Sequence, residues 1–207
     1  MLEHLPSWLG GLMRNMRAGH SKLTIVDPDL GLGPATIDLS SPAFANGARL
    51  PIRFTADGDG VSPPLVWGPL PEGTQSLALI VEDPDAPATR PLIHCLIWGL
   101  PADAGRIAEG AIVADGDGSE IGEVGRNSLF REGWLPPDPP NGHGTHDYVF
   151  QLFALGETED IGANPSRAHM VRAMEGKVLA AGLLVGTYSR GEPKTTDEVP
   201  VGFGVPA

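Results

Sequence analysis

The feature that most constrains the fold is the segment from His146 to Leu155, which has the pattern of one β-strand with two apolar faces. Its side chains alternate with a period of two, with Tyr148 and Phe150 on one side and Val149 and Phe153 on the other. A strand with one solvated face would alternate apolar with polar residues instead. This segment is therefore predicted to lie between two packed layers of the protein.

Polar side chains gather where this strand begins. His146 and Tyr148 fall on the same face, at the mouth of the predicted strand. The preceding segment, residues 136–140, is proline at every position except Asp138. Each proline fixes its own φ and restricts the residue before it, so this loop is stiff. A rigid loop beside an imidazole and a phenol predicts a small polar pocket.

Two other predicted strands bring further polar groups to their ends. Residues 76–83 form an apolar run that passes into a turn carrying Asp83 and Asp85, and residues 92–100 form a second run with His94 near its start. A carboxylate can accept a hydrogen bond from a histidine ring, fixing its tautomer and favouring the charged form. A plainer alternative is that each aspartate only forms the turn.

The composition and spacing of turn residues predict a mainly β protein. The chain has 207 residues, with 28 glycines and 21 prolines, and its short apolar runs are separated by turn clusters. We expect an antiparallel β-sandwich with a few peripheral helices. The predicted division is an amphipathic helix and linker in residues 1–34, the sandwich domain in residues 35–190 and a tail in residues 191–207. A net charge of −12 disfavours nucleic acid as a partner.

Two segments have helical patterns. Residues 5–18 place apolar side chains at a helical spacing, so this helix is expected to pack on its own domain or to form a homodimer with a second subunit. A membrane-surface anchor is the alternative. A second helix is expected to begin at an Asn164 cap and to end at Gly182, with Val178 and Ala181 in its buried stripe, before a closing strand over residues 183–188.

No targeting or membrane-spanning pattern is evident in the sequence. The N-terminal residues lack a continuous apolar core with a cleavage site, and no apolar run approaches the roughly 20 residues that a transmembrane helix needs. The single cysteine, Cys95, falls within an apolar run and is predicted to be an inert core thiol. A soluble cytoplasmic protein is the expectation.

Five short motifs occur in an order that resembles the phosphatidylethanolamine-binding protein family, in its bacterial and archaeal Raf-kinase-inhibitor-like branch. The resemblance covers roughly residues 36–190 and supports the sandwich architecture. The motifs are Phe54–Trp67, the Asp83-Pro-Asp-Ala-Pro87 run, His94 at the start of the next strand, Pro139-Pro-x-Gly-x-Gly-x-His-x-Tyr148, and Gly186–Arg190.

The resemblance implies a pocket that receives phosphate-type head groups. Its rim would be formed by Asp83, Asp85, His94, His146 and Tyr148, and its wall by two prolines, which are Pro139 and Pro140. Histidine and tyrosine can donate hydrogen bonds to phosphate oxygens. The expected partner is thus a small anionic ligand or a phospholipid head group, and no cofactor or metal is expected.

The chain departs from the family's usual pattern near this pocket. Asp138 stands where the branch usually has cysteine, and Asp147 stands where arginine is usual, so both changes add negative charge. Family members often carry a cis peptide close to the cleft, and the corresponding bond here is Arg90–Pro91. A trans proline is the alternative, because trans is the commoner isomer before proline.

Competing functions remain open at this point. A binding protein with an anion pocket is the leading hypothesis. A hydrolase could use an Asp/His/Tyr cleft for acid–base chemistry, although the sequence has no Gly-x-Ser-x-Gly motif. An interaction protein with a vestigial pocket is the third. The His143-x-x-His146 spacing is a weak metal signal, and His143 is expected on an exposed loop. Trp134 is expected either in the cleft wall or in the core.

Overall fold

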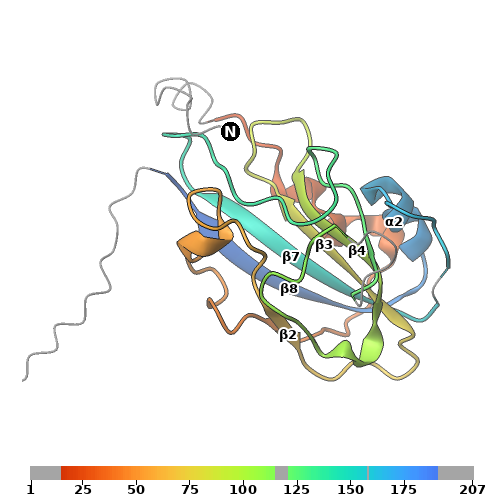
Figure 1. The fold of residues 1–207 in the computed structure, drawn as a ribbon. Coiled ribbons are helices and arrows are strands. Elements are labelled where there is room, and N and C mark those ends of the chain that lie inside the picture. The colour runs from red at the N-terminus through yellow and green to blue at the C-terminus, as the bar shows by residue number, and fades with distance from the viewer. Residues whose placement is uncertain (1–14, 115–120, 158, 191–207) are drawn as a thin grey trace, which may run out of the picture.

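The fold is built around one five-stranded antiparallel sheet (Figure 1). The computed structural model describes residues 15–114, 121–157 and 159–190. The strand order is β6-β4-β3-β7-β8, and a smaller sheet has the order β1-β2-β5. The large sheet consists of β3 (Ser76–Asp83), β4 (Leu92–Pro101), β6 (Glu123–Val124), β7 (His146–Leu155) and β8 (Val178–Tyr188), and the small sheet of β1 (Leu39–Ser40), β2 (Leu65–Trp67) and β5 (Arg106–Ile107).

Helical structure in the described residues is short. Within the described ranges the one α-helix is α2 (Arg167–Met174), and 3-10 turns occupy His20–Lys22, Thr24–Val26, Pro28–Leu30, Ile52–Phe54 and Ala102–Ala104. The protein is therefore mainly β, with two antiparallel sheets, as the sequence predicted. Among the described residues, no helix is both long and apolar enough to cross a lipid bilayer.

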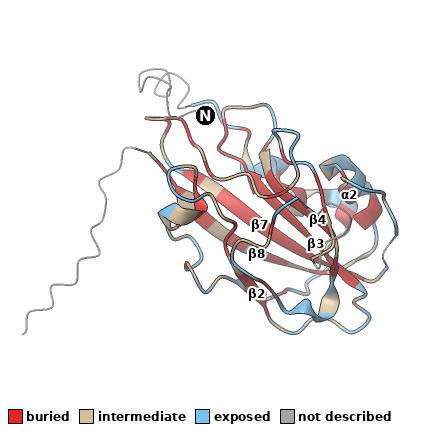
Figure 2. Ribbon diagram, in the orientation of Figure 1, coloured by how far each residue is buried: buried red, intermediate tan, exposed pale blue. Residues whose placement is uncertain are grey.

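The large sheet lies between two apolar layers. On one face, Leu79 and Phe150 pack with residues of the small sheet such as Leu65. On the other face, Ile80 and Phe153 pack with Met170 of α2 and with Leu30 of the N-terminal segment. Figure 1 shows β2 and α2 on opposite sides of the central strands, and Figure 2 shows those strands as largely buried. Both faces of β7 are therefore apolar because the strand lies between two packed layers, as the sequence predicted.

The helix after β7 is shorter than its sequence pattern suggested. Ser166 caps it, since its hydroxyl oxygen accepts a hydrogen bond from the His169 amide at 3.3 Å, and the helix ends at Met174. Val178 and Ala181 belong to β8. The predicted end at Gly182 is wrong because residues 178–188 pair along the whole of β7. That ladder outweighs the local helical spacing.

The N-terminal segment adds to the sheet's second layer. Residues 5–14 of the predicted N-terminal helix lie outside the described residues, as do residues 191–207, while residues 15–18 are not helical. The backbone amides of Ala18 and Gly19 donate to the carbonyls of Ala86 and Pro84 at 3.0 and 2.8 Å. Leu30, in the segment expected to be a linker, is fully buried. Residues 15–32 are therefore packed against the sheet as part of the domain.

Every peptide bond in the described part of the chain is trans, including Arg90–Pro91. The expectation of a cis bond there is wrong. The loop between β3 and β4 reaches its position without the rarer isomer, which before proline costs about 0.5–1 kcal/mol. Local contacts fix this loop, since the Ala88 amide donates to the Ala86 carbonyl at 2.7 Å and the Lys22 ammonium donates to the Thr89 carbonyl at 3.0 Å.

Gly186 provides a test of the packing beside the start of β7. It pairs with Tyr148, and a Cβ at this position would lie 2.4 Å from Leu50 Cδ2, in the core. Overpacking of this kind typically costs about 1–3 kcal/mol. We expect Gly186→Ala to lower the free energy of unfolding by about 2 kcal/mol in urea denaturation. Gly33→Ala, which meets no atom within 4 Å, is the control and should leave stability unchanged or slightly raised. Equal stabilities of the two variants would contradict this packing.

Candidate functional site

A small cavity lies at the end of the large sheet where β3 ends and β4 and β7 begin. Its volume is about 160 Å³. The strands supply Asp83, Leu92, His94 and His146, and the walls come from the 84–91 loop and from residues 129–140. The lining from these loops is Ala86, Pro87, Leu129, Leu135, Pro136, Asp138, Pro139 and Pro140. Mostly apolar walls therefore surround a small polar floor.

Asp83 and His146 form the central contact of the site. Asp83 is the last residue of β3 and His146 the first of β7, so the pair ties two adjacent strand ends together. The His146 Nδ1 atom lies 2.8 Å from Asp83 Oδ2, and the side chains are only 1% and 4% exposed. The other oxygen of Asp83 accepts the Asp85 amide at 2.8 Å. This carboxylate fixes both the histidine ring and the following turn.

His143 extends this contact into a chain of three residues. Its Nδ1 lies 2.7 Å from His146 Nε2, and the rings are 4.8 Å apart between centroids. His143 is fully buried, so the prediction of an exposed loop position was wrong. A hydrogen bond between the two rings needs one ring nitrogen as donor and the other as acceptor. The His143-x-x-His146 spacing thus serves a hydrogen bond between the rings, and Asp83, His146 and His143 form a continuous buried path.

His94 lines the cavity, with one ring nitrogen hydrogen-bonded and the other without a hydrogen-bond partner among the described residues. Its Nδ1 lies 2.6 Å from the Leu135 carbonyl oxygen, and the Leu135 amide donates to the His94 carbonyl at 2.8 Å. Since a carbonyl only accepts, Nδ1 carries the proton and Nε2 of the neutral ring is an acceptor. Nε2 is buried and has no hydrogen-bond partner among the described residues. Burial lowers the pKa of His94, which favours the neutral ring.

Tyr148 lies behind the lining residues, against the rings of His94 and His146. Its ring centroid is 5.0 Å from that of His94, edge to face, and 6.4 Å from that of His146. The residue is fully buried, and its hydroxyl has no partner in the described part of the chain. Burial, with Asp83 as a second cause, raises the pKa of Tyr148 well above its ordinary value. The hydroxyl therefore keeps its proton and remains a donor.

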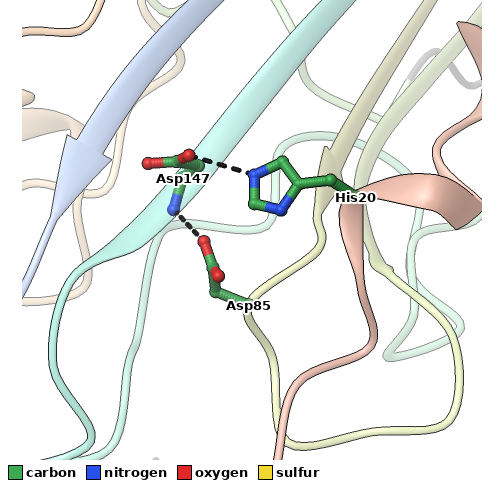
Figure 3. A group of neighbouring side chains, drawn as sticks. All are labelled: His20, Asp85 and Asp147. Atoms are coloured by element: carbon green, nitrogen blue, oxygen red, sulfur yellow. Dashed lines mark hydrogen bonds and ion pairs between the residues drawn. The ribbon is translucent and has the colours of Figure 1, made fainter.

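Asp85 points away from the cavity and is not among its lining residues. Its carboxylate accepts the Asp147 amide at 2.8 Å and forms an ion pair with Arg17. The Asp147 side chain in turn lies 3.1 Å from His20 Nε2. Figure 3 shows His20, Asp85 and Asp147 together at the start of β7. This group fastens the N-terminal segment to the turn that follows β3.

The two acidic departures from the family pattern each have a basic neighbour. Asp147 lies beside His20, and Asp138 lies 2.5 Å from the Arg190 guanidinium. Arg190 also donates to the Pro139 carbonyl at 3.0 Å and pairs with Asp57 at 2.7 Å. Its hydrogen bonds lower the pKa of Asp57. Arg190 thus offsets the charge of Asp138 and holds the proline wall in place.

Trp134 supports the floor of the cavity from the core side. Its ring stacks on Phe150 with a centroid distance of 5.9 Å, and its Nε1 donates to the Phe54 carbonyl at 3.2 Å. It lies 6.1 Å from the His94 ring and is absent from the cavity lining. The sequence left open whether Trp134 lies in the cleft wall or in the core, and the structure places it against the core.

The structure brings together Asp83, His94, His146, Pro139 and Pro140 around the cavity, and sets Tyr148 directly behind it. Asp85 is adjacent but faces outward. Sequence reasoning missed His143, the Leu135 carbonyl and Arg190 as parts of this arrangement. His143 had a signal in its spacing to His146, whereas a backbone carbonyl such as that of Leu135 leaves no sequence signal.

Comparison with known proteins places this arrangement in a family. The family profile described as phosphatidylethanolamine-binding protein matches residues 40–189. The chain belongs to the phosphatidylethanolamine-binding protein family. A crystal structure of the family homologue CT736 from Chlamydia trachomatis is similar with a TM-score of 0.68 and 31% identity, over 75% of this chain and 98% of that one. The crystal structure of YbcL of Escherichia coli, described as a member of the mammalian family, is similar with a TM-score of 0.69 and 28% identity, over 75% of this chain and 99% of that one.

Relatives in bacteria and archaea cover a similar share of the chain. A UPF0098 protein of Aquifex aeolicus is 36% identical over 165 residues, which is 76% of this chain and 91% of that protein. A UPF0098 protein of Methanothermobacter thermautotrophicus is 38% identical over 156 residues, 75% of this chain and all of that protein. LppC of Mycobacterium tuberculosis, described as a candidate lipoprotein, is 34% identical and covers 86% of both chains.

The protonation of His94 provides a test of the site. Its folded pKa is lowered by burial, below an unfolded value of about 6.5. Between these two pKa values the unfolded chain binds more protons than the folded one, so the free energy of unfolding rises with pH. The contribution of His94 to stability is complete above about pH 6.5. We expect the His94 ring, followed by NMR, to titrate below about 6.5 and to carry its proton on Nδ1 when neutral. A ring that titrates at or above about 6.5 would contradict the buried, neutral assignment.

Proposed function

We propose that this protein is a small binding protein whose cavity takes a phosphate-type anionic group, carried by a phospholipid head group or by another phosphorylated ligand. The observation that carries the proposal is the pair of buried polar atoms, His94 Nε2 and Tyr148 Oη, that have no partner in the described residues. Each unsatisfied buried group costs about 1–3 kcal/mol. A ligand that completes both hydrogen bonds would recover that cost on binding.

The chemistry of the two atoms specifies what the ligand must offer. Neutral His94 presents a lone pair at Nε2 and so requires a donor, whereas the Tyr148 hydroxyl can donate to an oxygen. A singly protonated phosphate group carries both a P–OH donor and acceptor oxygens. A phosphate dianion would instead accept hydrogen bonds from both groups if His94 took up the proton at Nε2. In both cases the hydrogen bond between the phosphate and His94 Nε2 contains one proton.

The surroundings are compatible with a small anion. Asp138, which lines the cavity, is paired with Arg190, and Asp83 is engaged by His146 and the Asp85 amide. A volume of about 160 Å³ suits a head group rather than a whole lipid. The apolar walls would exclude water and strengthen the few polar contacts. The described lining residues include no serine, threonine or cysteine that could act as a nucleophile, which favours binding over hydrolysis.

The two tyrosines of the chain provide a matched test of this proposal. Tyr148→Phe removes the unpaired hydroxyl, whereas Tyr188→Phe removes a hydroxyl that donates to Asp57 at 2.6 Å. Tyr188 is not a lining residue of the cavity. We expect Tyr148→Phe to weaken phosphate binding about tenfold, a loss of about 1.4 kcal/mol, without lowering the stability of the free protein. Tyr188→Phe should retain phosphate affinity and lose about 1 kcal/mol of stability.

Isothermal titration calorimetry and thermal unfolding would measure these effects. Full phosphate affinity in Tyr148→Phe, or equal losses in both variants, would contradict a hydrogen bond between the Tyr148 hydroxyl and the ligand. Turnover of phosphate-ester or carboxylate-ester substrates by the wild type would instead support the hydrolase alternative, with the Asp83–His146–His143 path as its acid–base group.

Proton linkage gives a further expectation. Above the second pKa of a phosphate monoester, about 6, the free ligand is a dianion and the free His94 ring is neutral. Binding must therefore take up about one proton, and affinity should fall about tenfold for each pH unit above that value. Titrations in buffers of different ionisation enthalpy would measure the uptake. Constant affinity without proton uptake between about pH 7 and 8.5 would contradict the shared proton.

A further inference from the structure

A second and larger cavity lies on the other face of the large sheet, beside the start of α2. Its volume is about 650 Å³. The lining residues that matter here are Lys22, Glu82, Thr89, Arg90, Arg167 and Ala168. A volume of this size lies within the range of roughly 300–1,000 Å³ that holds small molecules. Nothing in the family's phosphate-type pocket accounts for it.

The alternation of β3 separates the two cavities. Asp83 points to the first cavity, whereas its neighbour Glu82 points to the opposite face and lines the second. The loop over residues 84–91 lies between them, since Ala86 and Pro87 line the first cavity and Thr89 and Arg90 the second. The second cavity therefore has its own floor and its own set of charges.

A buried carboxylate holds Arg167 in position at this cavity. Glu82 is fully buried and accepts from the Thr24 amide at 2.7 Å, from Gln151 Nε2 at 2.8 Å and from Arg167 Nε at 2.7 Å. Arg167 also donates through Nη2 to the Lys22 carbonyl at 3.2 Å. These contacts use one edge of the guanidinium. Because the fork is fixed in place, little entropy is lost when it binds an anion.

Two further cations reach the same space. The Lys22 ammonium is bonded to a backbone carbonyl, that of Thr89, and has no carboxylate partner among the described residues. Arg90 is exposed on the loop and has no hydrogen bond or ion pair within the described ranges. With Asp27 and Glu82 counted against Lys22, Arg90 and Arg167, the lining carries a net charge of +1, in a chain whose net charge is −12.

The start of α2 adds to this positive potential. Arg167 and Ala168 are the first two residues of the helix and both line the cavity. Backbone amides in the first turn of a helix have no acceptor within the helix, and the helix dipole favours negative charge there. The amides therefore supplement three side chains that are already cationic. Oxyanions of phosphoryl type match such a combination of guanidinium, ammonium and backbone donors.

We propose that this cavity is a second anion site, which binds the phosphoryl group of a small phosphorylated molecule between Lys22, Arg90 and Arg167. The Ala168 amide provides an additional donor. The site is independent of the His94 cavity and uses none of its residues. The second cavity has a volume of about 650 Å³ and the first about 160 Å³, a ratio of about four. The larger volume leaves room for the remainder of the ligand.

Inorganic pyrophosphate is the probe for the test, with the full-length protein at constant pH and ionic strength. Backbone amide shifts of Ala168 and Arg90 report on the second cavity, and that of Tyr148 reports on the first. The test variant is Lys22→Gln/Arg90→Gln. Arg167 is left intact because its removal would leave the buried Glu82 carboxylate without its ion pair, which is strongly destabilising.

The control variant is Arg106→Gln/Arg131→Gln, which changes two exposed arginines that line neither cavity. Each double variant lowers the net charge from −12 to −14, so a general charge effect would be equal in both. We expect saturable shifts at Ala168 in the wild type and the control, and at least a tenfold weaker affinity in the test variant. The Ala168 response should persist in His94→Gln, which separates it from the first cavity.

Two outcomes would overturn the proposal. One is the absence of a saturable response at Ala168 in the wild type. The other is an equal loss of affinity in the test and control variants, which would indicate general counter-ion accumulation. Amide spectra of both variants without pyrophosphate establish that the fold is retained.

Discussion

Burial of the large sheet on both faces is the constraint on which the rest of the structure depends. Because β3, β4 and β7 have apolar neighbours above and below, polar side chains concentrate at the ends of these strands. At one such end, Asp83 and His146 face one layer, and Glu82 faces the other. Each buried carboxylate has a basic partner and further donors, as an interior of low polarity requires. The two cavities are consequences of this arrangement, on opposite faces of a single sheet.

The first cavity differs from a fully satisfied polar core in one respect. Asp83, His146 and His143 complete one another's hydrogen bonds, and Arg190 fixes the proline wall. His94 Nε2 and the Tyr148 hydroxyl are nevertheless left without partners in the described residues. A domain of ordinary stability has only about 5–15 kcal/mol in total, so two such atoms are a considerable cost. Under the proposed function, a ligand would supply the missing contacts.

The fold and much of the site could be predicted from local patterns. The alternation around Tyr148 and Phe150 identified a central strand, and the motif order located His94, His146 and the prolines. The end of α2 could not be predicted, because Val178 and Ala181 satisfy a helical spacing, and only pairing with β7 decides between helix and strand. Asp85 was expected at the pocket rim, but its side chain faces Arg17 and the Asp147 amide. His143 is buried by a ring contact that its glycine-rich surroundings do not indicate.

The proposed function requires that His94 Nε2, on the cavity lining, and the Tyr148 hydroxyl behind it form hydrogen bonds with a ligand rather than with the protein. A crystal structure grown in phosphate at a pH near 6.5, at a resolution that defines ring orientations, tests it most directly. We expect a phosphate in the His94 cavity with oxygen atoms about 2.6–3.0 Å from both atoms, and with His94 Nδ1 still donating to the Leu135 carbonyl. A cavity without phosphate, in which His94 Nε2 or the Tyr148 hydroxyl bonds to another protein group, would contradict it.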